Sequence, residues 1–185
     1  MPPLKADLNT LVLHSARFIL RPLTRTDAAA LLPAFADSAV MKWWSRGPFT
    51  SEQELAEWLV PDTGWEEGRS WAVVERENGP AIGRMAAMDR GDGVSELACL
   101  TIPERQGQGV AREALGVLID HLVKQEGRRR IYADVDIDNA ASNRLFEALG
   151  FTREGVLREA MTTHIGRRDS VIWGLLDGDP RPGLG

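Results

Sequence analysis

The sequence predicts a mixed α/β fold in which a central, mostly antiparallel twisted sheet is flanked by helices. Strand-like segments at 70–75, 81–88 and 94–102 are joined by short, turn-rich connections, which favours an antiparallel meander. A glycine turn leads from the last of these segments into a helical pattern. A further strand-like alternation follows that helix at 131–137, so a right-handed crossover between the flanking strands is expected.

Length and composition predict one globular domain. The 185 residues suffice for a full core and are too few to expect two domains, and 43% hydrophobic with 26% charged residues is ordinary for an enzyme. We expect a single domain over residues 1–185, with its core at about 11–176 and a loose tail at 177–185.

The net charge and the cysteine content bear on which ligands the protein binds and in which compartment it is found. The net charge of −5 argues against nucleic-acid binding and suits attraction of a cationic amine, although solubility alone explains such a charge. One cysteine excludes an internal disulfide, and no apolar run reaches the length of a signal-peptide core or a membrane span. We therefore expect a cytoplasmic protein that binds neither nucleic acid nor membrane.

The chain opens with a predicted strand and a short helix. Residues 11–20 are expected to form a strand that is bounded by Pro22. A helix start follows at 24–27 and continues over 28–32. Pro33 is expected to kink or end that helix.

A loop rich in aromatic residues comes next. Trp43 and Trp44 are adjacent, so on an extended segment their side chains point to opposite sides. One of them is expected to line something other than the core; the alternative is that both pack the helices onto the sheet. The next helix begins at a capping box of Ser51 and Glu54. Its apolar face carries Leu55, Trp58 and Leu59.

Two further helices and a last strand are predicted in the second half. The helix after the glycine turn is expected to end near Gly127. Its apolar stripe comprises Ala111, Leu115, Leu118, Ile119 and Leu122. Another helix is predicted over about 140–149, closed by Gly150, and the last strong strand covers 170–176.

The glycine turn has the features of a phosphate-binding site. The first N–H groups of a helix lack partners within the helix, and the aligned peptide dipoles leave positive charge at that end. Gly107 and Gly109 allow the backbone to approach an anion closely, and Arg105 and Arg112 flank the turn. A glycine turn of this kind also serves as a plain connector, so a second motif is needed to support the interpretation.

The spacing excludes two familiar phosphate-binding motifs and fits a third. Val110 and Ala111 stand where a P-loop needs lysine and then serine or threonine, and Arg112 stands where a dinucleotide fingerprint needs glycine. The pattern Gln106-x-x-Gly109-x-Ala111 is similar to the acetyl-CoA signature of the GCN5-related N-acetyltransferases, the GNAT superfamily.

A second motif carries the same resemblance. Asn139-x-x-Ser142-x-Arg144, with the closing Leu-Gly-Phe at 149–151, resembles the other hallmark of the family and lies at the expected separation from the first. The segment 17–24 resembles the start of RimJ/RimL-like enzymes, the branch that acetylates ribosomal proteins. The resemblance covers nearly the whole chain and implies the GNAT fold.

The resemblance implies acetyl-CoA as co-substrate and assigns residues to it. Loop amides hold the pyrophosphate in the family, a role that maps to Gln106, Gly107, Gln108, Gly109, Val110 and Ala111. The strand before the loop splays from its parallel neighbour and its backbone holds the pantetheine arm, a role that maps to Leu100, Thr101 and Ile102. Early helices and their loop wall the acceptor groove, which assigns Trp43 and Trp44 to the acceptor.

Ser142 is the candidate for protonating the departing thiolate. With Asn139 as the helix N-cap, Ser142 lies in the first turn, where the helix dipole favours developing negative charge. RimL-like enzymes use their matching serine in this way, and the alternative is a serine that only satisfies backbone groups. Asn139 either contacts the coenzyme as well or only caps the helix.

The general base is harder to assign. Glu96 precedes the central strand at a position where related sequences commonly carry glutamate, and it can accept a proton directly or through water. The alternative is a carboxylate in an ordinary ion pair. Glu159, His164 and Asp169 lie in or near the last hairpin, where the sequence does not align them clearly with the family's base. A further candidate is a chain of water molecules that carries the proton without one residue acting as the base.

Two other chemistries are not expected. Cys99 lies on the coenzyme strand, but no activating histidine or lysine is evident nearby, so we expect a small buried hydrophobe rather than an acetylated nucleophile. The three histidines, His14, His121 and His164, lack metal-ligand spacing, so no metal is predicted.

The predicted activity is direct transfer of an acetyl group to a primary amine in a ternary complex. A lysine amine, with a reference pKa about 2.4 units above that of an α-amine, needs about 3 kcal/mol more for deprotonation. A site without a clear strong base therefore favours a protein N-terminal α-amine. The alternatives are acetylation of a small molecule (an antibiotic, a polyamine or an amino acid) and an acyl-CoA-binding regulatory module without turnover. The resemblance also makes a homodimer plausible.

Overall fold

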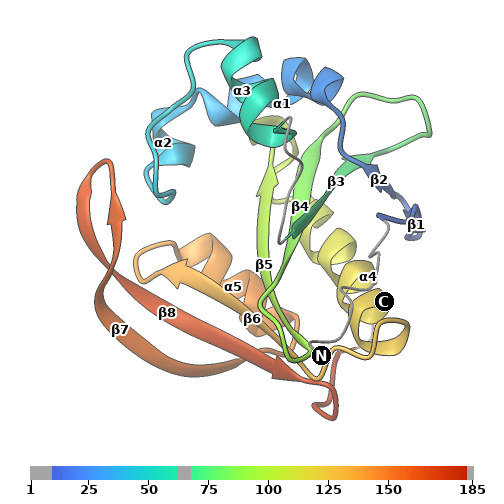
Figure 1. Cartoon of the computed structure of the whole chain (residues 1–185), viewed down its shortest axis with the longest axis vertical. Helices are drawn as coiled ribbons and strands as arrows, with labels where there is room; N and C mark the ends of the chain where they lie inside the picture. The colour runs from blue at the N-terminus through green and yellow to red at the C-terminus, as the bar shows by residue number, and fades with distance from the viewer. Residues whose placement is uncertain (1–9, 62–67, 183–185) are drawn as a thin grey trace, which may run out of the picture.

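The computed structural model describes residues 10–61 and 68–182. Within these residues, eight strands form one sheet in the order β1-β2-β3-β4-β5-β6-β8-β7 (Figure 1). The strands are β1 Leu13–His14, β2 Ile19–Pro22, β3 Gly68–Val74, β4 Gly83–Asp89, β5 Val94–Thr101, β6 Arg130–Asp136, β7 Thr152–Thr163 and β8 Gly166–Leu176. The α-helices are α1 Ala28–Phe35, α2 Ser38–Met41, α3 Glu52–Leu59, α4 Val110–Lys124 and α5 Ala140–Ala148. The short 3₁₀ turns are η1 Arg25–Asp27 and η2 Pro103–Arg105.

The sheet is antiparallel except where β5 runs parallel to β6. The strands β3, β4 and β5 form the predicted antiparallel meander, because short turns join them. The helix α4 connects β5 to its parallel neighbour β6. The predicted mixed α/β fold with a mostly antiparallel sheet is therefore confirmed.

Helices pack against the sheet as two separate groups. Buried side chains of α4 and α5 form one core with sheet residues such as Trp71, Met85 and Leu97. Buried side chains of α1, α2 and α3 form a second core that includes Ala72 and Leu100. Because successive strand residues point to opposite faces, neighbours such as Trp71 and Ala72 belong to different cores.

Two predictions near the N-terminus differ from the structure. The expected strand at 11–20 is split into β1 and β2 by a turn in which the N–H and the hydroxyl of Ser15 both donate to Phe18 O. The helix α1 continues past Pro33 and ends at Phe35. Pro33 removes only one hydrogen bond near the helix end, and the buried Leu31 and Phe35 hold that turn onto the core.

The later helices match their predictions. The buried face of α4 includes Leu115, Leu118, Ile119 and Leu122, and Ala111 packs at its edge. Gly150 closes α5 with φ of +88°, in the left-handed region that favours glycine. A Cβ at Gly150 would lie 2.9 Å from Pro182 Cδ, so the chain after β8 packs against the end of α5. Residues 183–185 of the expected tail lie outside the described residues.

Candidate active site

The parallel strands β5 and β6 separate part-way along their length. β5 pairs with β4 from Ser95 to Thr101, whereas its pairing with β6 covers only residues 94–96. Beyond Glu96 and its partner Tyr132, the strand β6 pairs with β8 alone. A wedge therefore opens between β5 and β6, as the resemblance to the GNAT family implied.

The hydrogen bonds of β5 decide which backbone groups face this wedge. The N–H of Ile102 donates to Ile82 O at 3.0 Å, on the β4 side. Residues in an antiparallel pair alternate the direction of their backbone groups, so Leu100 also points to β4, whereas Cys99 and Thr101 point into the wedge. The residues predicted from the sequence were Leu100, Thr101 and Ile102; the backbone geometry instead favours Cys99 and Thr101 as partners for a bound chain.

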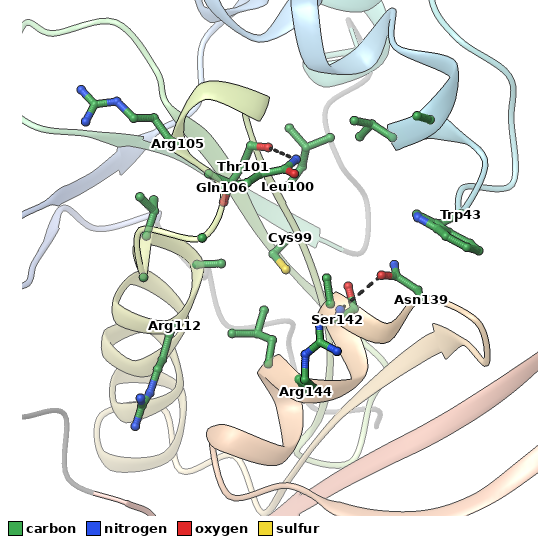
Figure 2. Close-up of a pocket in the computed structure, with 18 of the residues that line it drawn as sticks. Trp43, Cys99, Leu100, Thr101, Arg105, Gln106, Arg112, Asn139, Ser142 and Arg144 are labelled. Carbon is green, nitrogen blue, oxygen red and sulfur yellow. Dashed lines mark hydrogen bonds between the residues drawn. The ribbon is translucent and has the colours of Figure 1, made fainter.

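A cavity of about 420 Å³ lies over the wedge (Figure 2). Its walls come from the end of β5, the glycine loop, the start of α5, and α2 with the turn that follows. The predicted residues that line it are Trp43, Trp44, Leu100, Thr101, Gln106, Gly107, Gly109, Val110, Ala111, Asn139 and Ser142. Ile102, Gln108 and Glu96 are not among its described lining residues. That lining includes Arg112 and Arg144 and no carboxylate, so the cavity suits an anionic ligand.

The glycine loop leads into the N-terminus of α4. Gly107 and Gly109 have φ of +74° and +79°, a conformation that glycine adopts without strain. Gly109 is the N-cap of α4 and has no side chain to bind the first-turn N–H groups. Those N–H groups can therefore bind an anion. The Gln106 side chain donates to Thr101 O at 3.1 Å, so its amide supports the loop.

Arg17 holds the glycine loop from a distant part of the chain. Its terminal guanidinium nitrogens donate to Gln108 O at 3.2 Å, and its Nε donates to Glu113 of α4 at 2.7 Å. Arg105, predicted to flank the phosphate, instead donates to Glu75 at 2.8 Å. Figure 2 shows the Arg105 guanidinium directed away from the cavity. Spacing in the sequence offers no signal for the Arg17 contact, which bridges 91 positions.

The start of α5 brings Asn139 and Ser142 to the cavity (Figure 2). Asn139 is the N-cap, as predicted, and its Oδ1 accepts from the Ser142 N–H at 3.2 Å. The Ser142 hydroxyl has no hydrogen-bond partner within the described part of the chain. Asn143 anchors this turn, because its Nδ2 donates to Asp136 O at 3.1 Å and its Oδ1 accepts from Trp173 at 2.8 Å.

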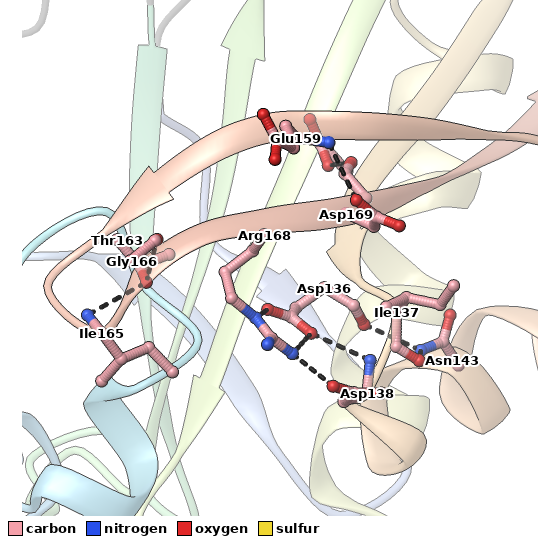
Figure 3. Close-up of polar contacts among 12 residues, drawn as sticks. Asp136, Ile137, Asp138, Asn143, Glu159, Thr163, Ile165, Gly166, Arg168 and Asp169 are labelled. Atoms are coloured by element: carbon pink, nitrogen blue, oxygen red, sulfur yellow. Dashed lines mark hydrogen bonds and ion pairs between the residues drawn. The ribbon is translucent and has the colours of Figure 1, made fainter.

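A buried ion pair fixes the end of β6 on the sheet face opposite α5 (Figure 3). The Arg168 guanidinium donates to Asp136 at 2.8 and 3.0 Å and also contacts Asp138. Burial raises the pKa of Asp136, but the hydrogen bonds from Arg168 and the Asp138 N–H outweigh burial and bring that pKa below its ordinary value. The turn between β6 and α5, which carries Asn139, is thus held by charge as well as by packing.

Both adjacent tryptophans line the cavity, and Trp44 also packs against the core. Trp44 packs in an aromatic cluster, with ring centroids 5.7 Å from Phe35 and 6.2 Å from Trp58. Trp43 stands on the same side of the cavity view as Asn139 (Figure 2), and Lys42 Nζ lies 4.3 Å from its ring centroid. Trp43 therefore has little part in the core and offers its indole to the cavity.

Two carboxylates lie on the sheet face that α1, α2 and α3 cover. Glu96 accepts from Arg90 at 2.8 Å and from the Tyr132 hydroxyl at 2.9 Å, so the ordinary ion pair considered for Glu96 is present. Asp134, two residues after Tyr132, accepts from the Ser170 hydroxyl. Burial raises the pKa of Asp134, the Ser170 hydrogen bond opposes this, and the charge of Glu96 adds to the rise. Asp134 was not predicted as a functional residue, although the alternation at 131–137 places it on the same face of the strand as Tyr132.

The other base candidates belong to the β7–β8 hairpin and do not line the described cavity. Asp169 accepts from the Glu159 N–H at 2.8 Å, and the Glu159 carboxylate pairs with Arg167. His164 lies at the tip of the hairpin, 3.8 Å from where a Cβ on Gly47 would stand. The hairpin tip therefore borders the loop after α2.

Cys99 lines the cavity as a neutral thiol. Burial raises its pKa to about 12, so little thiolate exists at neutral pH. Within residues 10–61 and 68–182, no group of three or more His, Cys, Asp or Glu side chains is arranged to hold a metal ion. No helix in those same ranges is both long enough and apolar enough to span a membrane.

A family model described as the acetyltransferase (GNAT) domain matches residues 17–152, which include the glycine loop, the wedge and the start of α5. The chain belongs to the GNAT family. It is therefore an N-acetyltransferase, and GNAT enzymes use acetyl-CoA.

Similar proteins differ in the amine that their names record. The chain is 31% identical to the uncharacterized N-acetyltransferase YoaA of Bacillus subtilis, over 81% of this chain and 88% of that one. It is 38% identical to the ribosomal protein bS18-alanine N-acetyltransferase of Escherichia coli, over 40% of this chain and 49% of that one. It also resembles a spermidine N-acetyltransferase from Vibrio cholerae, solved with CoA and spermine, with a TM-score of 0.77, 23% identity and coverage of 89% and 98%.

Proposed function

We propose that this GNAT enzyme transfers the acetyl group of acetyl-CoA to the α-amine at the N-terminus of a peptide or protein. Both substrates are held together in one complex, and the acetyl group passes directly between them. The observation that carries the proposal is the cavity over the wedge, where the glycine loop, the Ser142 hydroxyl and the unpaired edge of β5 converge.

The described residues fit coenzyme A. The free N–H groups at the start of α4 suit a pyrophosphate, and the cavity lining is basic. Thr101 Oγ1 is buried beside the cavity without a hydrogen-bond partner among the described residues, which leaves it available to an amide of the pantetheine arm. The backbone groups of Cys99 and Thr101 extend the same row. When bound, acetyl-CoA supplies the thioester carbonyl that the amine attacks.

Ser142 is proposed to give its hydroxyl proton to the departing sulfur. It lies in the first turn of α5, where the helix dipole stabilises developing negative charge by about 0.3–1 kcal/mol. Asn139 Oδ1 already caps the helix, so a contact of Asn139 with the coenzyme falls to its amide nitrogen. Cys99 is not proposed as a nucleophile, because its thiol stays protonated.

The charges beside the wedge suit an acceptor with a single amine. A polyamine needs several free carboxylates along its length, but Arg168 neutralises Asp136 and Arg90 neutralises Glu96. Asp134 has no basic partner in the described part of the chain, so one carboxylate remains for one ammonium group. Glu96 stays in the proposal as the second carboxylate able to accept a proton on this face.

An α-amine suits this site better than a lysine side chain. Deprotonating lysine at neutral pH costs about 3 kcal/mol more, and no strong base lines the described cavity. Similarity to the bS18-alanine N-acetyltransferase supports the same choice. A small-molecule amine is the second candidate, because the fold also matches a spermidine N-acetyltransferase.

The remaining parts of the proposal follow from the sequence. We place the enzyme in the RimJ/RimL-like branch and in the cytoplasm, as a single domain over residues 1–185. A homodimer stays a prediction from the family resemblance.

The test is release of free thiol from acetyl-CoA in the presence of separate amines. The panel contains peptides that start with Ser or Ala, the same peptides with a blocked N-terminus and an internal lysine, spermidine, and an aminoglycoside. We expect turnover only with the free α-amine peptides. Turnover with spermidine or the aminoglycoside, and none with any peptide, would contradict the peptide substrate and support a small-molecule amine as the acceptor.

A further inference from the structure

We propose that Asp134 is the group that takes the proton from the ammonium of the acceptor. This inference rests on the proposed acetyl transfer and names a residue that neither the sequence motifs nor the family match assigns. It concerns the sheet face opposite α4 and α5, where the wedge meets the carboxylates of β5 and β6.

The position of Asp134 follows from the register. Glu96 and Tyr132 form the last pair between β5 and β6, and Asp134 comes two residues later on the same face of β6. Its backbone pairs only with β8, at Ile172, so β5 has already diverged at this level. Asp134 therefore stands on the floor of the wedge just past the point where it opens.

The turn after α2 lies above this part of the sheet. The positive charge of Lys42 contributes to the lowered pKa of Asp136, the next residue on the same face of β6. Trp43 follows Lys42 directly and lines the cavity. Asp134 is not among the described lining residues of the cavity, but it lies on β6 beside the opening of the wedge, where we infer that an amine entering past Trp43 meets it.

Asp134 and Asp136 differ in what holds them. Asp136 is fully buried as a side chain and is neutralised by Arg168. Asp134 is half-buried, and its hydrogen bond in the described part of the chain comes from the neutral Ser170 hydroxyl. Burying a carboxylate costs free energy unless a positive charge compensates it. Arg168 provides that positive charge for Asp136, and an incoming ammonium group would provide it for Asp134.

The groups around Asp134 set its proton affinity in opposite directions. Burial raises the pKa of Asp134, the Ser170 hydrogen bond lowers it, and the negative charge of Glu96 raises it, with a net rise. Glu96 is itself bound by Arg90 and Tyr132, and on β8 the charged Arg168 is taken up by Asp136. A carboxylate whose pKa moves towards neutrality is a stronger base for an ammonium group than an ordinary aspartate.

Asp134 accepts one proton from the ammonium, and the freed lone pair on nitrogen forms the N–C bond to the thioester carbonyl carbon. The C–S bond breaks with its electron pair going to sulfur, which takes a proton from Ser142. The nitrogen sheds its second surplus proton, through solvent, back to Ser142 as the amide forms. Asp134 later releases its proton to solvent, so each turnover frees one proton.

The test is the dependence of kcat/KM on pH for four variants of the full chain, with one acceptor peptide throughout. Asp134→Asn keeps the shape of the side chain and should lower kcat by about 100-fold or more while acetyl-CoA affinity stays within about twofold. Asp134→Glu should restore part of the rate. Ser170→Ala should move the acidic limb of the profile to higher pH, and Glu96→Gln should move it to lower pH.

Asp134 is supported as the base if the acidic limb of the kcat/KM profile moves in opposite directions in Ser170→Ala and Glu96→Gln and disappears in Asp134→Asn. A merely structural role of Asp134 would not produce this pattern. An intact limb in Asp134→Asn overturns it. Loss of the limb in Glu96→Gln with its retention in Asp134→Asn also overturns it and makes Glu96 the base. If spermidine proves to be the acceptor, the proposed peptide substrate fails, and the same four profiles measured with spermidine judge Asp134 separately.

Discussion

The two faces of the wedge differ in what they offer a ligand. On the face that α4 and α5 cover, the groups available are mainly backbone: the glycine loop, the first N–H groups of α4 and the edge of β5. On the face that α1, α2 and α3 cover, they are side chains, chiefly Asp134, Glu96 and Trp43. Binding through backbone groups depends on the conformation of the chain, whereas binding through side chains depends on which residue types are present. Coenzyme binding and acceptor choice are therefore expected to respond to different mutations.

The largest effect is expected from a charge placed on the backbone side. Gly109→Glu puts a carboxylate where a pyrophosphate should bind, at a position with φ of +79° whose Cβ would also lie 3.2 Å from an Arg17 nitrogen. We expect acetyl-CoA affinity by calorimetry to fall by about 1,000-fold or more, since one unfavourable charge contact in such a site costs several kcal/mol. Gly91→Glu is the matched control, because Gly91 has φ of +76° and a Cβ there would have no atom of the described residues within 4 Å. Equal affinity in the two variants would remove the loop from the coenzyme site.

The ion pair between Asp136 and Arg168 holds the end of β6, just before the turn that leads into α5. Asp136→Asn leaves Arg168 without its buried partner and should lower the free energy of unfolding by about 3 kcal/mol at pH 7, whereas exposed Asp138→Asn should cost less than about 1 kcal/mol. Because the pKa of Asp136 is lowered in the folded protein, its stabilisation is complete above about pH 4 and is lost as the pH falls further. Urea unfolding of both variants at neutral and acidic pH measures this. A difference that stays constant with pH would contradict the ionic origin.

Substitution of Ser142 tests whether its hydroxyl protonates the departing sulfur. Ser142→Ala removes a hydroxyl without a partner in the described structure, so stability should change by less than about 0.5 kcal/mol. We expect kcat to fall by about 50-fold, with acetyl-CoA affinity kept, because the leaving sulfur loses its proton donor. Steady-state kinetics and calorimetry on the same sample separate the two quantities. Full activity would leave Ser142 with a capping-turn role alone.

The smallest effect separates the two tryptophans. Trp43→Ala should raise the KM for the acceptor by about tenfold and leave that for acetyl-CoA unchanged, because the Trp43 indole faces the cavity. Trp44→Ala should instead lower the free energy of unfolding by about 2 kcal/mol through loss of its contacts with Phe35 and Trp58. Thermal unfolding and kinetics of the pair distinguish these outcomes. The reverse pattern would place Trp43 in the core.

The same contrast explains what the sequence could predict. The glycine loop and the start of α5 could be located from the sequence because their features are local in the chain: two glycines before a helix, and Asn139 three residues before Ser142. Their role in binding the coenzyme stays a prediction. The turn at Ser15 was not predicted, and α1 does not end at Pro33 but continues to Phe35, because burial of its side chains holds the last turn on the core. Asp134 and Arg17 were missed because their meaning depends on partners at Ser170 and Gln108, which only the folded sheet brings close.

The most direct measurement is a competition with two amines in one tube. The enzyme and acetyl-CoA are incubated with equal amounts of spermidine and a Ser-starting peptide that contains an internal lysine, and the products are identified by fragment mass spectrometry. We predict acetylation at the peptide α-amine, with the lysine and spermidine unmodified. Acetylation of spermidine or of the lysine in preference to the α-amine would contradict the account.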